Sequence, residues 1–277
     1  MIEFHKVCFT YPGCEKNHNR VLHNIDIRFE KGKFYSLIGS NGSGKSTLAR
    51  LINGLIHPFE GKIYIDGLEV LPQNFIEIRQ KVGYIFQNPE NQIVSTIVEN
   101  EVAFALENLG IPYDEMHRKV TEILEFVELN DMRKRPPHNL SGGQKQRLAI
   151  ASVVVMEPDY IIFDEPTSML DYNGRREVIN SIKKLHKAGK TIILISHDAE
   201  EIVLADEIII LHEGEIVAKK RPIDFLKDVD LRNNINFQQI PDHLKFAIKY
   251  NINTLNKEEI IDIMQKNILP TTGILTL

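Results

Sequence analysis

The chain has 277 residues, of which 43% are hydrophobic and 26% charged, and its formal net charge is −5. This composition predicts a globular protein with a sizeable core and excludes an intrinsically disordered chain. The mildly acidic balance argues against a general nucleic-acid binder, which would normally carry a strongly basic face, so we expect no nucleic-acid partner.

No segment is apolar over the ~18 residues that a transmembrane helix needs, and the most apolar runs, around Thr191–Ile195 and Glu207–Leu211, are far shorter. Residues 1–7 lack a basic stretch followed by an apolar one, so we expect no signal peptide. The two cysteines, Cys8 and Cys14, fit a reducing compartment, and no nearby residues complete a zinc-like ligand set around them.

The N-terminal part alternates apolar and polar residues in short runs, which predicts strands. A glycine-rich turn follows the third run and precedes a segment with helical character, and Asp66-Gly67 is typical of a hairpin turn. The predicted elements are strands over 2–11 and 21–29 with a polar loop at 13–20 between them, a strand over 33–38, a helix over 46–55 and a hairpin strand over 62–65.

Between Pro89 and Pro137 apolar residues recur at spacings of three and four, as in Val98, Val102 and Leu106, which predicts a helical insert. We place this helical subdomain at about residues 89–140. Alternation of strands and helices then resumes, and strands without polar side chains predict burial on both faces. The expected elements are strands over 160–163 and 191–195, a helix over 178–186 and a closing hairpin over 207–211 and 215–218.

A boundary is expected near Arg221-Pro222, since the periodicity beyond it is weaker. We therefore divide the chain into a main domain over residues 1–222 and a small C-terminal helical domain over 223–277. Helices are expected over 244–250 and 257–266, the second capped by Asn256 or Thr254.

The segment Gly39-Ser40-Asn41-Gly42-Ser43-Gly44-Lys45-Ser46-Thr47 fits the pattern G-x-x-x-x-G-K-[ST] and lies between a predicted strand and a predicted helix. Its glycines allow backbone N–H groups to point inward, and the helix N-terminus adds partial positive charge. Lys45 should reach the β- and γ-phosphates of a nucleotide, and the Ser46 hydroxyl should bind Mg²⁺. The sequence therefore predicts a phosphate loop that binds ATP.

The strand that starts at Tyr160 ends in two carboxylates, Asp164 and Glu165. Asp164 would hold Mg²⁺, directly or through water, and Glu165 would orient and deprotonate the attacking water. By itself this pattern could equally be a strand that ends at a solvated acidic turn, and the phosphate loop upstream favours the catalytic interpretation.

The string Leu140-Ser141-Gly142-Gly143-Gln144 resembles the signature motif of ATP-binding-cassette (ABC) proteins and precedes the acidic strand, as it does in that family. Before a predicted helix that starts at Gln144, the serine and two glycines again suggest an anion site at a helix N-terminus. The resemblance implies a RecA-like P-loop core with a mostly parallel sheet, an antiparallel N-terminal β subdomain and an α-helical signature subdomain, beside the small C-terminal appendage.

The family's other elements can be carried over one at a time and cover roughly residues 1 to 222. Tyr11 resembles the aromatic that stacks on adenine, Gln87 the glutamine between core and insert, and His197 the switch histidine at the γ-phosphate. Residues 168–171 resemble the loop that crosses the dimer interface, with Met169 replacing the usual alanine. Tyr11 as an ordinary strand aromatic, Gln87 as a surface residue and His197 as a core histidine are the competing interpretations.

Together these assignments give one set of expected site residues and a working unit of two cassettes. In the family, Ser141 and Gly143 of one subunit bind the γ-phosphate held by the other in a head-to-tail dimer. Glu165, His197 and Gln87 are expected to be catalytic, and Ser46, Gln87 and Asp164 to bind Mg²⁺. The expected ATP-binding residues are Tyr11, Gly39, Ser40, Asn41, Gly42, Ser43, Gly44, Lys45, Ser46, Thr47, Ser141, Gly142, Gly143, Gln144 and Asp171.

A narrower resemblance concerns residues 86–94 and 99–104, which are similar to the ATPase subunits of energy-coupling factor transporters, specifically the first of two A-type ATPases. It implies a second cassette, with a heterodimer favoured over a homodimer, a transmembrane coupling subunit, a substrate-binding membrane subunit and a place at the cytoplasmic face of the cell membrane. The importers of this family take up vitamins or metal ions. Glu90, Glu99 or Glu101 is expected to contribute charge to the groove for the membrane partner, with a solvated helix face as the alternative.

Three functions remain open at this point: a transport ATPase, a cassette protein that acts as a switch in DNA repair or translation, and a nucleotide-binding scaffold without turnover. A switch usually carries a long coiled coil or two cassettes in one chain, and neither pattern is present. A scaffold would have an altered residue at Glu165, which is intact. The transport ATPase is the favoured hypothesis.

Overall fold

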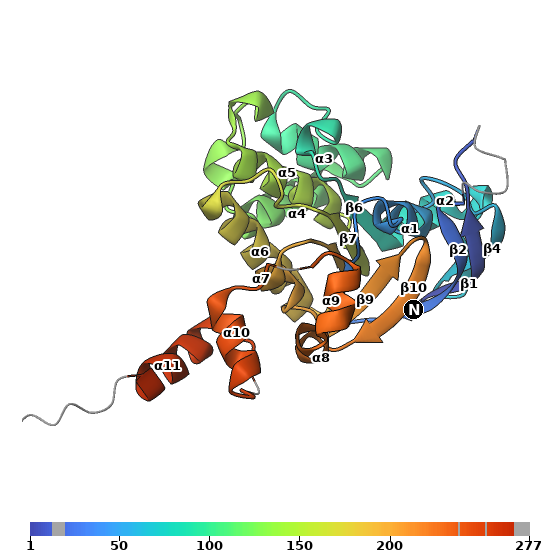
Figure 1. Cartoon of the computed structure of the whole chain (residues 1–277). Helices are drawn as coiled ribbons and strands as arrows, with labels where there is room; N and C mark the ends of the chain where they lie inside the picture. The colour runs from blue at the N-terminus through green and yellow to red at the C-terminus, as the bar shows by residue number, and fades with distance from the viewer. Residues whose placement is uncertain (13–19, 238, 253, 269–277) are drawn as a thin grey trace, which may run out of the picture.

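The computed structural model describes residues 1–12, 20–237, 239–252 and 254–268, and these build two β-sheets with helices around them (Figure 1). The smaller sheet is antiparallel, in the order β2-β1-β4-β5. Its strands are β1 (Ile2–Phe9), β2 (Leu22–Phe29), β4 (Glu60–Ile65) and β5 (Leu68–Glu69). This confirms the predicted antiparallel subdomain, although β1 ends before Tyr11, and most of the predicted loop at 13–20 lies outside the described residues.

The larger sheet has the order β10-β9-β3-β8-β7-β6 and is parallel except for the β9–β10 hairpin. Its parallel strands are almost entirely buried, as expected where both faces are covered. The bounds are β3 (Phe34–Ile38), β6 (Val82–Ile85), β7 (Tyr160–Asp164), β8 (Thr191–Ile195), β9 (Glu207–His212) and β10 (Glu215–Lys220). Strand β6 was not predicted, because four buried residues show no recognisable period.

The predicted helical insert is confirmed as a helical layer beside the sheet that consists chiefly of α3 (Val98–Asn108) and α4 (Tyr113–Phe126), and α5 (Gly142–Val154) packs against α3. Apolar side chains of α3, α4 and α5 share one core with β7 and β8. The remaining helices of this region are α1 (Lys45–Ile52), α2 (Phe75–Lys81), α6 (Tyr172–Lys187) and α7 (Ala199–Ile202), with short 3-10 turns at Pro72–Asn74, Pro89–Asn91, Asn130–Met132 and Pro137–Asn139.

Among the described residues, four helices follow β10: α8 (Pro222–Lys227), α9 (Val229–Asn234), α10 (Asp242–Lys249) and α11 (Lys257–Ile268). The sequence predicted the last two, and Asn256 accepts from the backbone N–H groups of Glu258 and Glu259 at the start of α11. Phe225, Leu244 and Ile260 share a core with Ile208 and Ile210 of β9. The appendage therefore packs against the main sheet, and its delimitation at residue 223 stays a prediction.

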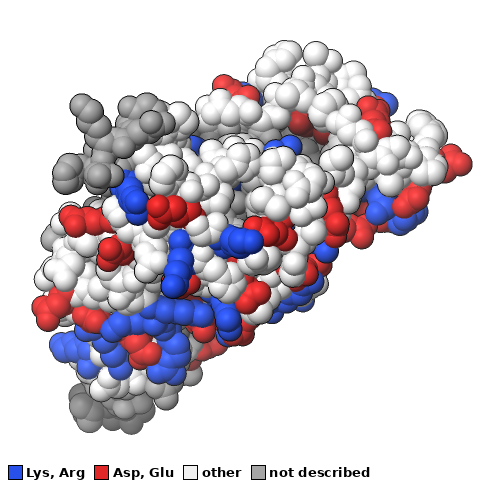
Figure 2. All heavy atoms as spheres, turned by 90° about the vertical axis from the view of Figure 1, so that its right-hand side faces the viewer, with Lys and Arg blue, Asp and Glu red and all other residues white. Residues whose placement is uncertain are grey.

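Figure 2 views the face that carries the antiparallel sheet, where basic and acidic side chains are interleaved and Lys and Arg gather toward the lower edge. Although the net charge of the chain is −5, this face carries no single continuous acidic patch. Among the described helices none is long and apolar enough to span a bilayer. Cys8 is buried and unpaired, and the described residues hold no cluster of three or more His, Cys, Asp or Glu side chains suited to a metal ion.

Candidate nucleotide site

Four loops of the site leave the carboxyl ends of four parallel strands, where ligands bind in open α/β sheets. The phosphate loop begins at Gly39, directly after β3. Gln87 comes two residues after β6, Glu165 directly after β7, and His197 two residues after β8. Because these strands are parallel neighbours in the larger sheet, residues between 32 and 158 positions apart in the sequence meet at one edge.

The phosphate loop is held close to the sheet by glycines whose conformations other residues rarely adopt. Gly44 has φ 103°, a left-handed conformation that favours glycine. At Gly39 an added Cβ would lie 1.9 Å from the carbonyl oxygen of Leu211, so no side chain fits there. The loop then passes into α1, and its amides lie at the N-terminus of that helix.

Lys45 is buried, and its Nζ donates to the carbonyl oxygens of Gly39 (3.1 Å) and Ser40 (2.9 Å). Burial lowers the pKa of Lys45, while the nearby Glu165 and Asp164 raise it. The Ser43 hydroxyl is also buried and has no hydrogen-bond partner among the described residues. A buried cation and an unpartnered donor at a helix N-terminus fit the phosphates of a nucleotide.

Asp164 is buried at the end of β7 and joins the phosphate loop to the sheet. The Ser46 hydroxyl donates to its Oδ1 (2.8 Å), and the Tyr84 hydroxyl donates to its Oδ2 (2.6 Å). Burial first, and then the charge of Asp164, raise the pKa of Tyr84, so the phenol stays a donor. A hydroxyl and a carboxylate oxygen side by side are the hard ligands that Mg²⁺ accepts together with substrate phosphates.

Glu165 lies between two of the predicted catalytic side chains. His197 Nε2 is 3.2 Å from its Oε1, and Gln87 Nε2 donates to its Oε2 at 2.9 Å. The hydrogen bond with His197, opposed by burial, lowers the pKa of Glu165. The backbone of Glu165 has φ 49°, a conformation that costs roughly 1–2 kcal/mol for a residue with a side chain. Such outliers cluster at functional sites.

Tyr11 lies outside β1, with a half-exposed ring. Its hydroxyl is 3.1 Å from the Thr47 hydroxyl of α1, and its ring packs edge-on against Phe9 at 4.8 Å between centroids. The aromatic therefore stands beside the phosphate loop, and its stacking on adenine stays a prediction.

The signature turn lies at the start of α5, where Ser141 and Gln144 form a reciprocal capping box. An added Cβ at Gly143 would lie 2.7 Å from Gly174 Cα, so Gly143 permits close packing of α5 on α6. Asp171 caps α6 by accepting from the N–H of Gly174. Within the described part of this single chain, no hydrogen bond or ion pair joins the residues of the signature turn to the phosphate loop.

The acidic residues expected at the membrane-partner groove have different environments. Glu90 is exposed and pairs with Lys145, and Glu99 pairs with Arg133 and Lys134. Glu101 is buried, and its Oε2 accepts from the backbone N–H groups of Val94 (2.8 Å) and Ser95 (2.7 Å). The expectation for Glu101 is therefore wrong, because its carboxylate fixes a loop and presents no surface charge.

Three contacts of this edge involve residues that the sequence analysis did not single out: Tyr84, Thr167 and Glu201. Tyr84 lies on the unpredicted strand β6. Thr167 Oγ1 donates to Glu201 Oε1, and Ser196 Oγ donates to Glu201 Oε2, both at 2.6 Å. A buried glutamate four residues after the switch histidine carries no sequence signal of its own, because only tertiary contacts show its partners.

The chain is similar to known transporter proteins. Residues 22–168 match the ABC transporter family. The chain is 46% identical over 237 residues to the energy-coupling factor transporter ATP-binding protein EcfA1 of Clostridium novyi, covering 85% of each. It is 41% identical over 266 residues to EcfA1 of Mycoplasmopsis synoviae, covering 94% of this chain and 98% of that protein.

Solved structures give the same result. The structure of cbiO1 from Clostridium perfringens, part of the ABC transporter complex cbiONQ, superposes with a TM-score of 0.74 at 30% identity and covers 86% of this chain and 94% of its own. A dimeric post-hydrolysis state of the cassette MJ0796, bound to ADP and Pi, gives 0.72 at 30% identity and covers 80% and 99%. The relatives are transporter proteins, which removes the competing hypothesis of a DNA-repair or translation switch. The chain belongs to the ABC transporter ATPases and, within them, to the ATP-binding subunits of energy-coupling factor importers.

Proposed function

We propose that this chain binds ATP with Mg²⁺ at the Gly39–Thr47 loop and hydrolyses it as one half of a head-to-tail pair of cassettes that drives a membrane importer. The observation that carries the proposal is the hydrogen bond of 2.8 Å between Ser46 and Asp164. It joins the phosphate loop to the strand whose next residue, Glu165, contacts both His197 and Gln87.

The chemistry follows from these positions. Amides of the loop and Lys45 bind the β- and γ-phosphates, Tyr11 stacks on the adenine, and Glu165 accepts a proton as a water oxygen attacks the γ-phosphorus and the bond to ADP breaks. Ser46, Asp164 and Gln87 would hold Mg²⁺, which neutralises charge that develops on the phosphate oxygens. His197 would contact the γ-phosphate, and its hydrogen bond lowers the pKa of Glu165.

A second cassette completes the site. Ser141, Gly142, Gly143 and Gln144 would bind the γ-phosphate on the partner, and Asp171 lies in the loop that would cross between the subunits. The described parts of one chain offer no contact between its own signature turn and its own phosphate loop, which supports a site shared by two chains. We favour a non-identical partner, as the resemblance to the first A-type ATPase implies.

The membrane partner has a candidate docking groove between α3 and α4. This pocket of about 400 Å³ is lined by Glu99, Ala103, Tyr113 and Met116 among others, and also by the basic Arg133 and Lys134. Tyr113 is largely exposed. The groove combines apolar side chains such as Met116 with the carboxylates of Glu99 and Glu107, which suit arginines on a helix of a transmembrane coupling subunit. A substrate-binding membrane subunit would complete the importer at the cytoplasmic face of the cell membrane.

Two measurements test the proposal. Copurification of the tagged chain from membranes should recover a second cassette and integral membrane subunits, and ATP turnover of that complex should fall at least about a hundredfold in Lys45→Ala or Glu165→Gln. Glu99→Arg should weaken assembly, whereas Glu115→Arg, on the exposed side of α4, should not. A complex whose turnover survives Lys45→Ala, or a strictly monomeric chain with full turnover, would contradict the proposal.

A further inference from the structure

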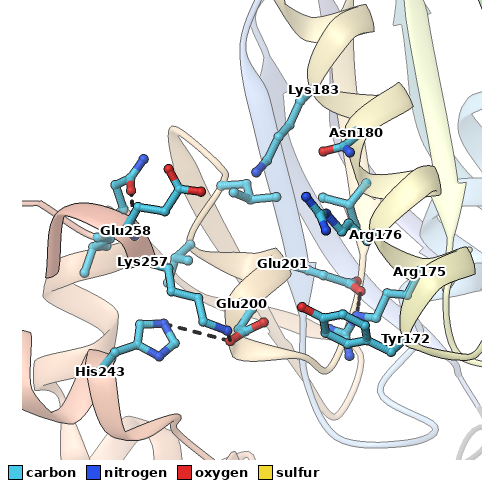
Figure 3. A pocket seen from close by; sticks show the side chains of 15 residues that line it. Tyr172, Arg175, Arg176, Asn180, Lys183, Glu200, Glu201, His243, Lys257 and Glu258 are labelled. Carbon is cyan, nitrogen blue, oxygen red and sulfur yellow. Dashed lines mark hydrogen bonds and ion pairs between the residues drawn. The ribbon is translucent and has the colours of Figure 1, made fainter. Parts of the chain in front are cut away.

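Glu201 is a buried carboxylate that lies outside the set of nucleotide-binding residues. Its side chain is only 2% exposed. Burial of a carboxylate is costly unless hydrogen bonds and an opposite charge compensate it. Glu201 has that compensation in full: Oε1 accepts from the Thr167 hydroxyl, Oε2 accepts from the Ser196 hydroxyl, and Arg175 Nε lies 2.8 Å from Oε1. Figure 3 shows the contact with Arg175.

The three partners of Glu201 come from three different segments of the site. Thr167 is two residues after Glu165, Ser196 directly precedes His197, and Arg175 lies in the first turn of α6, after the loop at 168–171. These segments also line one pocket of about 290 Å³ that includes Glu165, Ser168 and His197. One carboxylate thus joins the loop of the expected base, the loop of the switch histidine and the loop expected at the dimer interface.

Glu165 and His197 lie close in sequence to Thr167 and Ser196, and each needs a defined orientation to contact the other. Glu165 has a strained backbone, and its N–H donates to the carbonyl oxygen of Ile195. Ser168 donates to the Glu165 carbonyl oxygen and also lies 3.2 Å from Gln87 Nε2. Glu201 binds the hydroxyl of Thr167, near Glu165, and the hydroxyl of Ser196, next to His197. These two hydrogen bonds therefore restrict how far Glu165 and His197 can turn away from each other.

We propose that Glu201 is a positioning residue for hydrolysis: through Thr167 and Ser196 it fixes Glu165 and His197 relative to each other and to the loop at 168–171. This inference rests on the proposed function of that site. It assigns Glu201 no contact with ATP, so its loss slows the reaction after nucleotide has bound. Substitution of a merely structural residue would instead lower the stability of the protein without lowering kcat selectively relative to KM for ATP.

The matched control is the adjacent residue on the same short helix. Glu200 points to the other side of α7, where Lys257 of α11 donates to it at 2.7 Å and His243 lies 4.0 Å away (Figure 3). Glu200→Gln and Glu201→Gln remove the same charge from neighbouring positions. Only the second disturbs the contacts with Thr167 and Ser196.

The experiment uses the full complex, in which the second cassette carries a glutamine at its own hydrolytic carboxylate, so that turnover reports nucleotide bound to this chain. Glu201→Gln should lower kcat about tenfold or more while KM for ATP changes less than about twofold, and Glu200→Gln should change neither by more than about twofold. Thr167→Val and Ser196→Ala should each lower kcat about threefold, and in the Glu201→Gln background they should add little, because they act through the same carboxylate.

Unchanged kcat in Glu201→Gln, an equal effect in Glu200→Gln, or fully additive effects of the hydroxyl variants would overturn the proposal. If the Glu201→Gln variant does not assemble into the complex, Thr167→Val and Ser196→Ala test the proposal instead. Unchanged kcat in both of these variants would then contradict it. The turnover of Lys45→Ala is measured in the same experiment. Unchanged turnover in Lys45→Ala would contradict the proposed function itself. Lost turnover in Lys45→Ala together with normal turnover in Glu201→Gln would contradict only the positioning role.

Discussion

Glu165 and His197 meet across the ends of two neighbouring parallel strands, with Oε1 of the carboxylate 3.2 Å from Nε2 of the imidazole. The register of β7 and β8 pairs Asp164 with Ile195, so the residues that follow the two strands leave the sheet at the same level. The pairing of β7 with β8 therefore brings Glu165 and His197 close together, and side-chain hydrogen bonds such as that from Gln87 to Glu165 fix their orientation.

The pair predicts a pH effect. Because the hydrogen bond with His197 lowers the pKa of Glu165 below 4.5, the contact stabilises the folded chain above about pH 4.5 and loses this contribution as the pH falls through the lowered pKa. His197→Ala should raise the pKa of Glu165, which NMR titration of the ¹³C-labelled carboxyl group would measure. His186→Ala, whose imidazole lies near Asp206, is the control and should leave that titration unchanged. An unaltered Glu165 titration in His197→Ala would contradict the contact.

The hydrogen bond from Tyr84 to Asp164 should affect both the stability of the protein and its Mg²⁺ requirement, whereas a comparable bond elsewhere should affect stability alone. Tyr84→Phe and Tyr160→Phe each remove a buried hydroxyl that donates to a carboxylate, Asp164 in the first case and Asp66 in the second. Both changes should lower the free energy of unfolding by about 1–2 kcal/mol. Only Tyr84→Phe should raise the Mg²⁺ concentration for half-maximal turnover, since of the two carboxylates Asp164 and Asp66 only Asp164 is proposed to bind the ion. Equal Mg²⁺ requirements in both variants would argue against a role of Tyr84 in orienting Asp164.

The two glycines of the signature turn should differ in their tolerance of a methyl group. At Gly143 the new Cβ would lie 2.7 Å from the backbone of α6, and at Gly142 it would lie 3.4 Å from a methyl group of Leu170. Gly143→Ala should therefore destabilise the chain by about 2–3 kcal/mol as α5 and α6 move apart, and Gly142→Ala by less than ~1 kcal/mol. Thermal unfolding of the two variants measures this, and equal melting temperatures would contradict the close packing.

Glu101 should matter for folding of the insert and Glu90 should not. Glu101→Ala leaves the partly buried backbone N–H groups of Val94 and Ser95 without their acceptor and should cost about 1–3 kcal/mol. Glu90 is exposed, so Glu90→Ala should leave the melting temperature unchanged. Chemical denaturation of both variants tests the difference. A stable Glu101→Ala variant would show that the loop before α3 does not depend on that carboxylate.

The sequence by itself determined the local features. The strand–glycine loop–helix pattern at Lys45, the acidic end of β7 and the signature at Ser141 each depend on neighbouring residues, since phosphate binding needs consecutive backbone N–H groups and a helix N-terminus. Strong periodicity likewise determined the insert and most strands. The four-residue strand β6 and the short helices α7, α8 and α9 were missed, because so few residues carry no measurable period.

Only the tertiary structure decided which side chains share one place. Tyr84 reaches Asp164 because β6 pairs with β7, and Glu201 reaches Thr167 and Ser196 because the fold brings α7 next to their loops. It also separated Glu101, buried under a loop, from Glu90 and Glu99, although all three belong to one acidic stretch of sequence. The reason is physical: burial and hydrogen bonding depend on contacts between residues far apart in the chain, which the order of amino acids does not display.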